Sequence, residues 1–146
     1  MDDIYKLVSR FRAAIAVAKE AGEFAMDSRF RQFPIGCCDD TCDLLSRYLL
    51  ENEIKTCQVF GTYRDGIFEN TTSHAWLQLG NKTIIDITGD QFKYDTIFSN
   101  FDKVVYIGAE NGFYRLFEID GIYESCKIDD NLRLYSLYQA IMKYIL

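Results

Sequence analysis

Proline and histidine are nearly missing from this chain of 146 residues, where Pro34 is the only proline and His74 the only histidine. The sequence also has no internal repeat, no low-complexity tract and no linker-like stretch. A chain of this length with 49% hydrophobic residues can bury a core of its own. We therefore expect one domain over residues 1–146.

Long apolar runs and clusters of basic residues are missing as well. No run approaches the ~20 apolar residues of a membrane span, and residues 1–21 carry charges that the apolar core of a signal peptide would not. The net charge of -6 and the pI near 4.7 disfavour binding to a phosphate backbone or an anionic membrane. We expect neither nucleic acid nor a membrane among the partners.

The cysteines lack a Cys-x-x-Cys pair and are odd in number: Cys37, Cys38, Cys42, Cys57 and Cys126. An odd count without an export signal indicates reduced thiols, as in the cytoplasm, or in a domain delivered to another cell as an effector or toxin. A zinc ion would need two adjacent cysteines in one chelate, which is awkward. We expect no metal and no cofactor.

Helical periodicity at both ends and strand patterns between them predict an α+β fold. Apolar spacing indicates an N-terminal helix over residues 4–22 and a second helix of about four turns from Cys38. A closing helix is predicted over residues 132–145, with Asp129 and Asp130 as cap candidates. Between them come runs rich in β-branched and aromatic residues, expected to form an antiparallel meander: 55–63, 73–79, 82–88, 103–108 and 112–119.

Two kinds of side chain in this pattern carry chemistry. Cys37 and Cys38 stand where a Pro-Ile-Gly segment meets the second helix. Free cysteine often packs as a small apolar residue, but a helix N-terminus lowers the pKa of a thiol and makes it a nucleophile. His74 lies in a predicted strand, and Asp86 stands among isoleucines in the next one, where a buried carboxylate needs a partner. An imidazole N–H would be such a partner.

The loop between these two strands decides whether the imidazole and the carboxylate can meet. If Leu79 pairs with Thr83 across a three-residue loop, both groups face the same side of the sheet, one diagonal apart. A two-residue loop at Gly80 and Asn81 would place them on opposite faces. The catalytic interpretation therefore requires the longer loop.

Together the three groups match a nucleophile, a base and an orienting acid. Cys38 would lose its proton to His74, whose tautomer Asp86 would fix. The backbone N–H of the nucleophile, at the start of a helix, can donate to an oxyanion. Two alternatives stay open: Cys37 as the nucleophile if the helix begins one residue earlier, and Asp90 as the orienting acid.

These motifs resemble the transglutaminase-like branch of the papain-like cysteine enzymes. That family has Gly-x-Cys opening a helix, then a small residue and a Leu-Leu pair, then His-Ala-Trp on one strand and Asp-x-Thr on the next. The matching residues lie within about 33–92: Gly36, Cys38, Cys42, Leu44, Leu45, Ile54, His74, Ala75, Trp76, Asp86, Ile87 and Thr88. The spacing to Ile54 favours Cys38 over Cys37.

The resemblance implies a papain-like or transglutaminase-like core and acyl transfer or hydrolysis at an amide carbonyl through a thioester. The enzyme would be a peptidase, a glutamine deamidase or a transglutaminase-like enzyme acting on a protein or peptide amide. Gln32, six residues before Cys38, stands where papain-like enzymes place an oxyanion-hole glutamine, and Trp76 is a candidate pocket wall or core anchor. The alternative is a non-catalytic protein-binding module on the same fold, such as an inhibitor or immunity-type partner of a basic protein.

Overall fold

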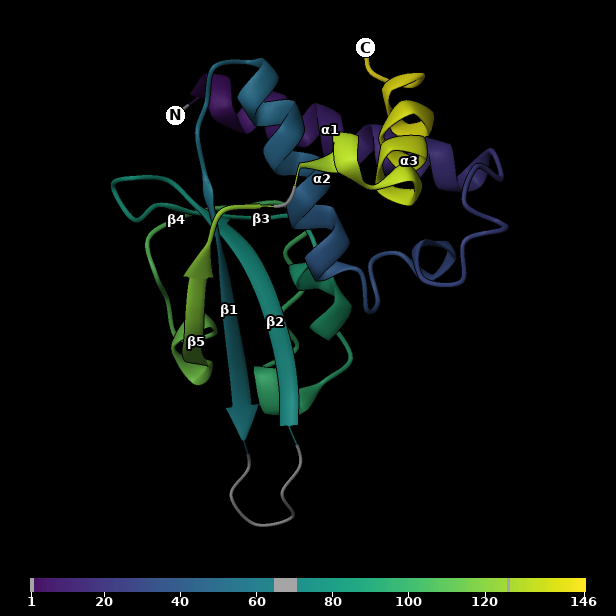
Figure 1. The fold of residues 1–146 in the computed structure, drawn as a ribbon. Coiled ribbons are helices and arrows are strands. Elements are labelled where there is room, and N and C mark those ends of the chain that lie inside the picture. Colours follow the sequence, from purple (N-terminus) through teal and green to yellow (C-terminus); the bar gives the residue numbers. More distant parts are fainter. Residues whose placement is uncertain (1, 65–70, 126) are drawn as a thin grey trace.

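The computed structural model describes residues 2–64, 71–125 and 127–146. Within these ranges the chain forms three α-helices and one five-stranded sheet, which confirms the α+β class. The helices are α1 (Asp2–Glu20), α2 (Cys38–Glu51) and α3 (Leu132–Met142). They gather at one end of the molecule, and α2 descends from there along the sheet (Figure 1). Cys126 lies outside the described residues.

The sheet is antiparallel, as expected, with the strand order β4-β3-β2-β1-β5. The first four strands follow one another as a meander, and the fifth returns to pair with β1. Their bounds are β1 (Cys57–Arg64), β2 (Thr71–Gln78), β3 (Ile84–Asp86), β4 (Tyr106–Gly108) and β5 (Glu118–Tyr123).

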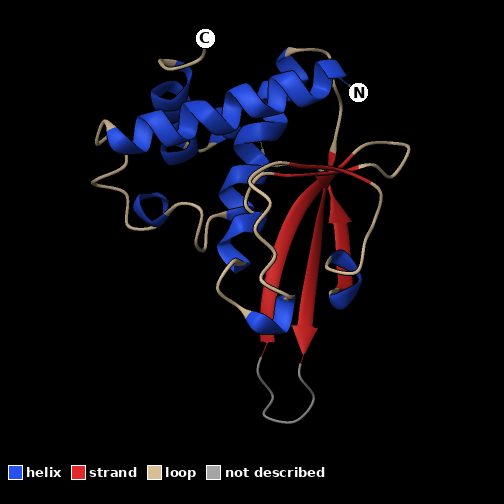
Figure 2. Cartoon of the chain, turned by 180° about the vertical axis from the view of Figure 1, so that it is seen from behind, coloured by secondary structure: helices blue, strands red, loops and turns tan. Residues whose placement is uncertain are grey.

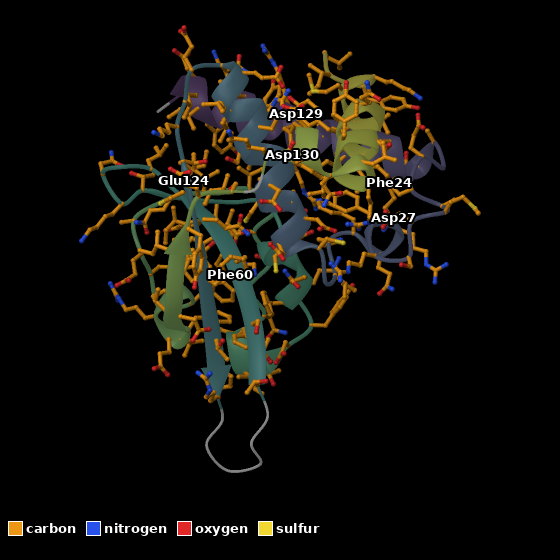
Figure 3. The ribbon with its side chains drawn as sticks, viewed as in Figure 1. Phe24, Asp27, Phe60, Glu124, Asp129 and Asp130 are labelled. Carbon is orange, nitrogen blue, oxygen red and sulfur yellow. The ribbon has the colours of Figure 1, made fainter. Side chains whose placement is uncertain are left out.

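Several boundaries predicted from the sequence are wrong, among them the start of β5 and the N-cap of α3. Turns and a bend take up residues 112–117 of the strand expected over 112–119, including the 3-10 turn Tyr114–Leu116, and β5 begins only at Glu118. The aromatic residues that suggested a strand are buried in a side-chain cluster instead. The cap of α3 is Asn131, whose side chain accepts the N–H of Leu134, whereas the expected cap residues lie in the preceding turn, Ile128–Asp130 (Figure 3).

The two faces of the sheet meet different partners. Ala75, Leu77, Ile85 and Ile87 join the apolar faces of the three helices in the larger core. On the opposite face, Trp76 packs with aromatic side chains from the 3-10 turns that follow β3 and precede β5, which lie beside the strands in Figure 2. This aromatic layer comprises Phe92, Phe98, Phe113, Tyr114 and Phe117. Strand alternation places His74 and Asp86 on the aromatic side.

Across the described ranges, none of the helices combines the length and the apolar character that a membrane span requires.

Candidate active site

The hairpin between β2 and β3 has the three-residue loop that the catalytic interpretation requires. Leu79 donates its N–H to the carbonyl of Thr83 at 2.9 Å, and Lys82 closes the loop in the left-handed conformation, with φ 70°. His74 Nε2 consequently lies 2.7 Å from Asp86 Oδ2. The prediction that these two side chains share a face and a hydrogen bond is confirmed.

Asp86 is buried, yet both of its oxygens accept hydrogen bonds. Thr88 donates its backbone N–H and its hydroxyl to Oδ1, at 3.0 and 3.3 Å. Tyr114 donates its hydroxyl to Oδ2 at 2.8 Å. Burial by itself raises the pKa of Asp86, but the charge of His74 and the donated hydrogen bonds outweigh burial and lower that pKa. The carboxylate is therefore ionised at neutral pH.

His74 has 0% of its surface exposed and is enclosed by aromatic rings. The ring centroids of Phe92 and Trp76 lie 5.0 and 5.6 Å from that of the imidazole. Burial lowers the pKa of His74, but the charge and hydrogen bond of Asp86, together with a side-chain hydrogen bond from Cys38, raise it to about 9. The site thus holds an imidazolium in a desolvated setting at neutral pH.

Cys38 is the first residue of α2 and is half-buried. Since Nε2 of His74 faces Asp86, Nδ1 is the ring nitrogen available for the hydrogen bond with the thiol. The first N–H groups of a helix have no acceptor within the helix and carry a partial positive charge. No side chain caps this end of α2, where Cys37 is the N-cap residue. The thiol therefore lies beside both an imidazole and a set of backbone donors.

Cys37, the alternative nucleophile, is enclosed by the protein. Its thiol is fully buried and donates to the carbonyls of Arg29 and Ile35, at 3.3 Å each. Burial, followed by the nearby carboxylate of Asp40, raises the pKa of Cys37 to about 12. The geometry therefore supports Cys38, and not Cys37, as the nucleophile.

Arg133 of α3 holds the start of α2 in place. It donates to both oxygens of Asp27, at 2.9 and 3.0 Å, and to Asp40 in the first turn of α2 at 2.7 Å. Asp27, which lies near α3 in Figure 3, also accepts the N–H of Phe30 at 2.8 Å. The segment leading to the nucleophile is thus tied to a helix near the other end of the chain.

Asp90, the alternative orienting acid, is engaged elsewhere. Its Oδ2 accepts from Arg12 of α1 at 2.7 Å, and the Arg12 guanidinium lies 4.5 Å from the ring centroid of Phe33. Its other oxygen has no hydrogen-bond partner among the described residues. Asp86 is the acid that contacts His74, so the geometry does not support Asp90 in this role.

The remaining two predicted site residues lie apart from the thiol. Gln32 is exposed, and its amide donates to the carbonyl of Ser28 at 3.3 Å, so the geometry offers no support for an oxyanion-hole role. Trp76 is buried against His74 and, with Tyr114, lines a surface hollow of about 370 Å³. It is both a core residue and a pocket wall.

Three residues of the site had no role assigned from the sequence. Thr88 belongs to the Asp-x-Thr motif, and this motif could have indicated its role in the site. Gln91 places Nε2 3.4 Å from His74 Nδ1 and donates to the carbonyl of Thr88 at 3.0 Å. Its closeness to Asp86 in the sequence was the only hint. Tyr114 comes from the segment misread as a strand, and nothing in its local sequence marked it.

Within the described ranges, no group of three or more His, Cys, Asp or Glu side chains is arranged to hold a metal ion. Comparisons with protein-family models, with curated proteins and with solved structures found no match for this chain.

Proposed function

We propose that this protein is a cysteine enzyme that transfers or hydrolyses an acyl group at an amide carbonyl, on a core like that of the transglutaminase-like branch of the papain-like enzymes. One observation carries the proposal. The buried ring of His74 is held between a carboxylate at 2.7 Å, Asp86, and the thiol of Cys38 at a helix start. This is the nucleophile–base–orienter geometry of thiol catalysis.

The proposed reaction has two halves. The Cys38 sulfur bonds to the amide carbon while its proton resides on His74, and the carbonyl electron pair moves onto oxygen. When that pair returns, the C–N bond breaks, the imidazolium protonates the leaving amine, and a thioester remains. Water or a second amine then attacks the thioester, gives its proton to His74, and releases the thiol. Protein or peptide amides are the proposed substrates.

Asp86 supports both halves by holding the Nε2 proton of His74 and stabilising the imidazolium. Its hydrogen bonds from Thr88 and Tyr114 keep it ionised and fixed in orientation. The donors at the start of α2 lie beside the sulfur, where a tetrahedral oxyanion would form.

A second candidate, a non-catalytic binding module on the same fold, is favoured by the closed form of the site. The cavity beside Cys38 has a volume of about 10 Å³, which is room for one water molecule. His74 is fully enclosed. With a net charge of -6, such a module would suit a basic protein partner.

Trapping an acyl-enzyme separates the two candidates. We expect p-nitrophenyl acetate, and amides or esters from a panel, to leave an acyl adduct on Cys38, read by intact mass and peptide mapping. Cys38→Ala should abolish the adduct, while the matched variant Cys37→Ala should retain it. A wild-type protein that forms no adduct with any member of the panel contradicts the enzyme proposal and favours the binding module.

A further inference from the structure

Gln91 is the polar side chain at the site that the proposed reaction does not yet use. It belongs to the 3-10 turn Gly89–Phe92 that follows β3. The residues on either side of it anchor this turn, because Asp90 pairs with Arg12 and Phe92 packs into the aromatic layer. The side chain of Gln91 is therefore presented to the site by a fixed stretch of backbone.

The amide of Gln91 has two N–H donors with different surroundings. One donates to the carbonyl of Thr88 at 3.0 Å, which fixes the plane of the amide. The nitrogen also lies 3.4 Å from Nδ1 of His74, the ring atom that faces the thiol. Whether Nδ1 accepts from Gln91 depends on the protonation state of the ring.

At neutral pH the ring is an imidazolium, which carries a hydrogen on both nitrogens and accepts no hydrogen bond. The N–H of Gln91 that faces Nδ1 therefore has no acceptor on the ring, and it remains available when negative charge develops on the carbonyl oxygen. A donor held in advance beside a developing oxyanion is the arrangement that lowers the barrier of acyl transfer.

We propose that Gln91 Nε2–H is the side-chain donor of the oxyanion hole, with the backbone N–H of Cys38 as its companion. This inference rests on the proposed function. It assigns to Gln91 the role that the sequence suggested for Gln32, whose amide is turned to Ser28 instead. The two glutamines are thus a natural test pair.

Two reactions of the same thiol test the assignment. Acylation of Cys38 by p-nitrophenyl acetate passes through a tetrahedral oxyanion, whereas alkylation by iodoacetamide displaces iodide from a saturated carbon and forms none. We expect Gln91→Met to lower the acylation rate by ~10²–10³-fold, as for the loss of one oxyanion-hole donor, and to leave the alkylation rate unchanged. Gln32→Met is the matched control and should change neither rate.

Each other outcome overturns the assignment. Equal losses in acylation and alkylation would mean that Gln91 only positions His74, and no loss in either would mean that it has no role. Thermal unfolding shows whether the Gln91→Met variant is folded. If it is not, the acylation and alkylation rates are measured on Gln91→Ala instead. Acylation that is absent already in the wild type would refute the proposed function itself, which is a distinguishable result.

Discussion

Asp86 and Asp90 lie within one short segment, and both are buried, with 2% and 8% of their surface exposed. Their environments nevertheless drive them in opposite directions. Asp86 accepts hydrogen bonds from His74, Thr88 and Tyr114, and its pKa is lowered. Asp90 has a guanidinium at 2.7 Å and one oxygen without a partner among the described residues, and burial raises its pKa.

The difference shows that an opposite charge alone does not keep a buried carboxylate in its preferred state. Arg12 is itself desolvated, so burial lowers its own pKa and the ion pair costs both partners hydration. Asp86 accepts hydrogen bonds from the neutral donors of Thr88 and Tyr114 in addition to that of the imidazole. These hydrogen bonds replace those to water that the carboxylate loses on burial. We therefore propose a chemical role for Asp86 and a structural role for Asp90.

The largest expected contrast is in the rate of acylation. Asp86→Asn keeps the shape of the side chain but removes the charge that holds the imidazolium, so we expect a loss of ~10⁴-fold in acylation of Cys38. Asp90→Asn is the matched change at the other acid. Its amide oxygen can still accept from Arg12 and hold the turn, so the rate should stay near that of the wild type. Stopped-flow assays with p-nitrophenyl acetate measure both. Equal losses would erase the distinction between the two acids.

A smaller effect is expected in the free energy of unfolding, where Asp90 is the sensitive residue. Asp90→Ala leaves the guanidinium of Arg12 buried without its ion pair, so the free energy of unfolding should fall by ~3 kcal/mol. In the double variant Arg12→Met/Asp90→Ala no unpaired charge is left, and much of this loss should be regained. Urea unfolding of wild type, both single variants and the double variant forms the cycle. Additive single effects would show that the pair is not coupled.

Per pH unit, the smallest effect is in the pH dependence of stability. The pKa of His74 is about 9 in the folded protein and 6.5 ordinarily, so its stabilisation is complete below pH 6.5 and is lost as the pH rises towards 9. We expect the free energy of unfolding to decline over this range by at most ~1.4 kcal/mol per pH unit. His74→Gln, which removes the only histidine, should flatten the decline between pH 6.5 and 8. A slope that is unchanged in this variant would assign the effect to other groups.

The parts of the site that follow from local rules could be predicted from the sequence. Strand alternation and the length of one hairpin loop were enough to bring His74 and Asp86 together, and the Gly-x-Cys pattern located the start of α2 at Cys38. The helices and the antiparallel pairing of consecutive strands were predicted because periodicity is a local property, whereas the pairing of β5 with β1 was not predicted.

The parts that depend on tertiary packing could not be predicted. Arg133 donates to Asp40, which is 93 positions away in the sequence, and no local pattern predicts such a pair. Tyr114 stands in a run whose aromatic residues have strand propensity, yet they serve a buried layer under the sheet. Strand propensity describes how well a residue fits a strand, and it does not predict which surface buries that residue.

In the proposed enzyme, the unusual start of α2 sets stability against activity. Cys37, with φ -110° and ψ 6°, has neither the extended backbone nor the oxygen acceptor of an ordinary N-cap residue, and its thiol is turned to two carbonyls. An effective cap stabilises a helix by ~1 kcal/mol, but it does so by occupying N–H groups of the first turn. Any evolutionary or engineered improvement of this helix end would therefore withdraw donors from the thiol next to it. If the proposed function holds, variants selected for thermostability should include changes at this helix end that lower the catalytic rate.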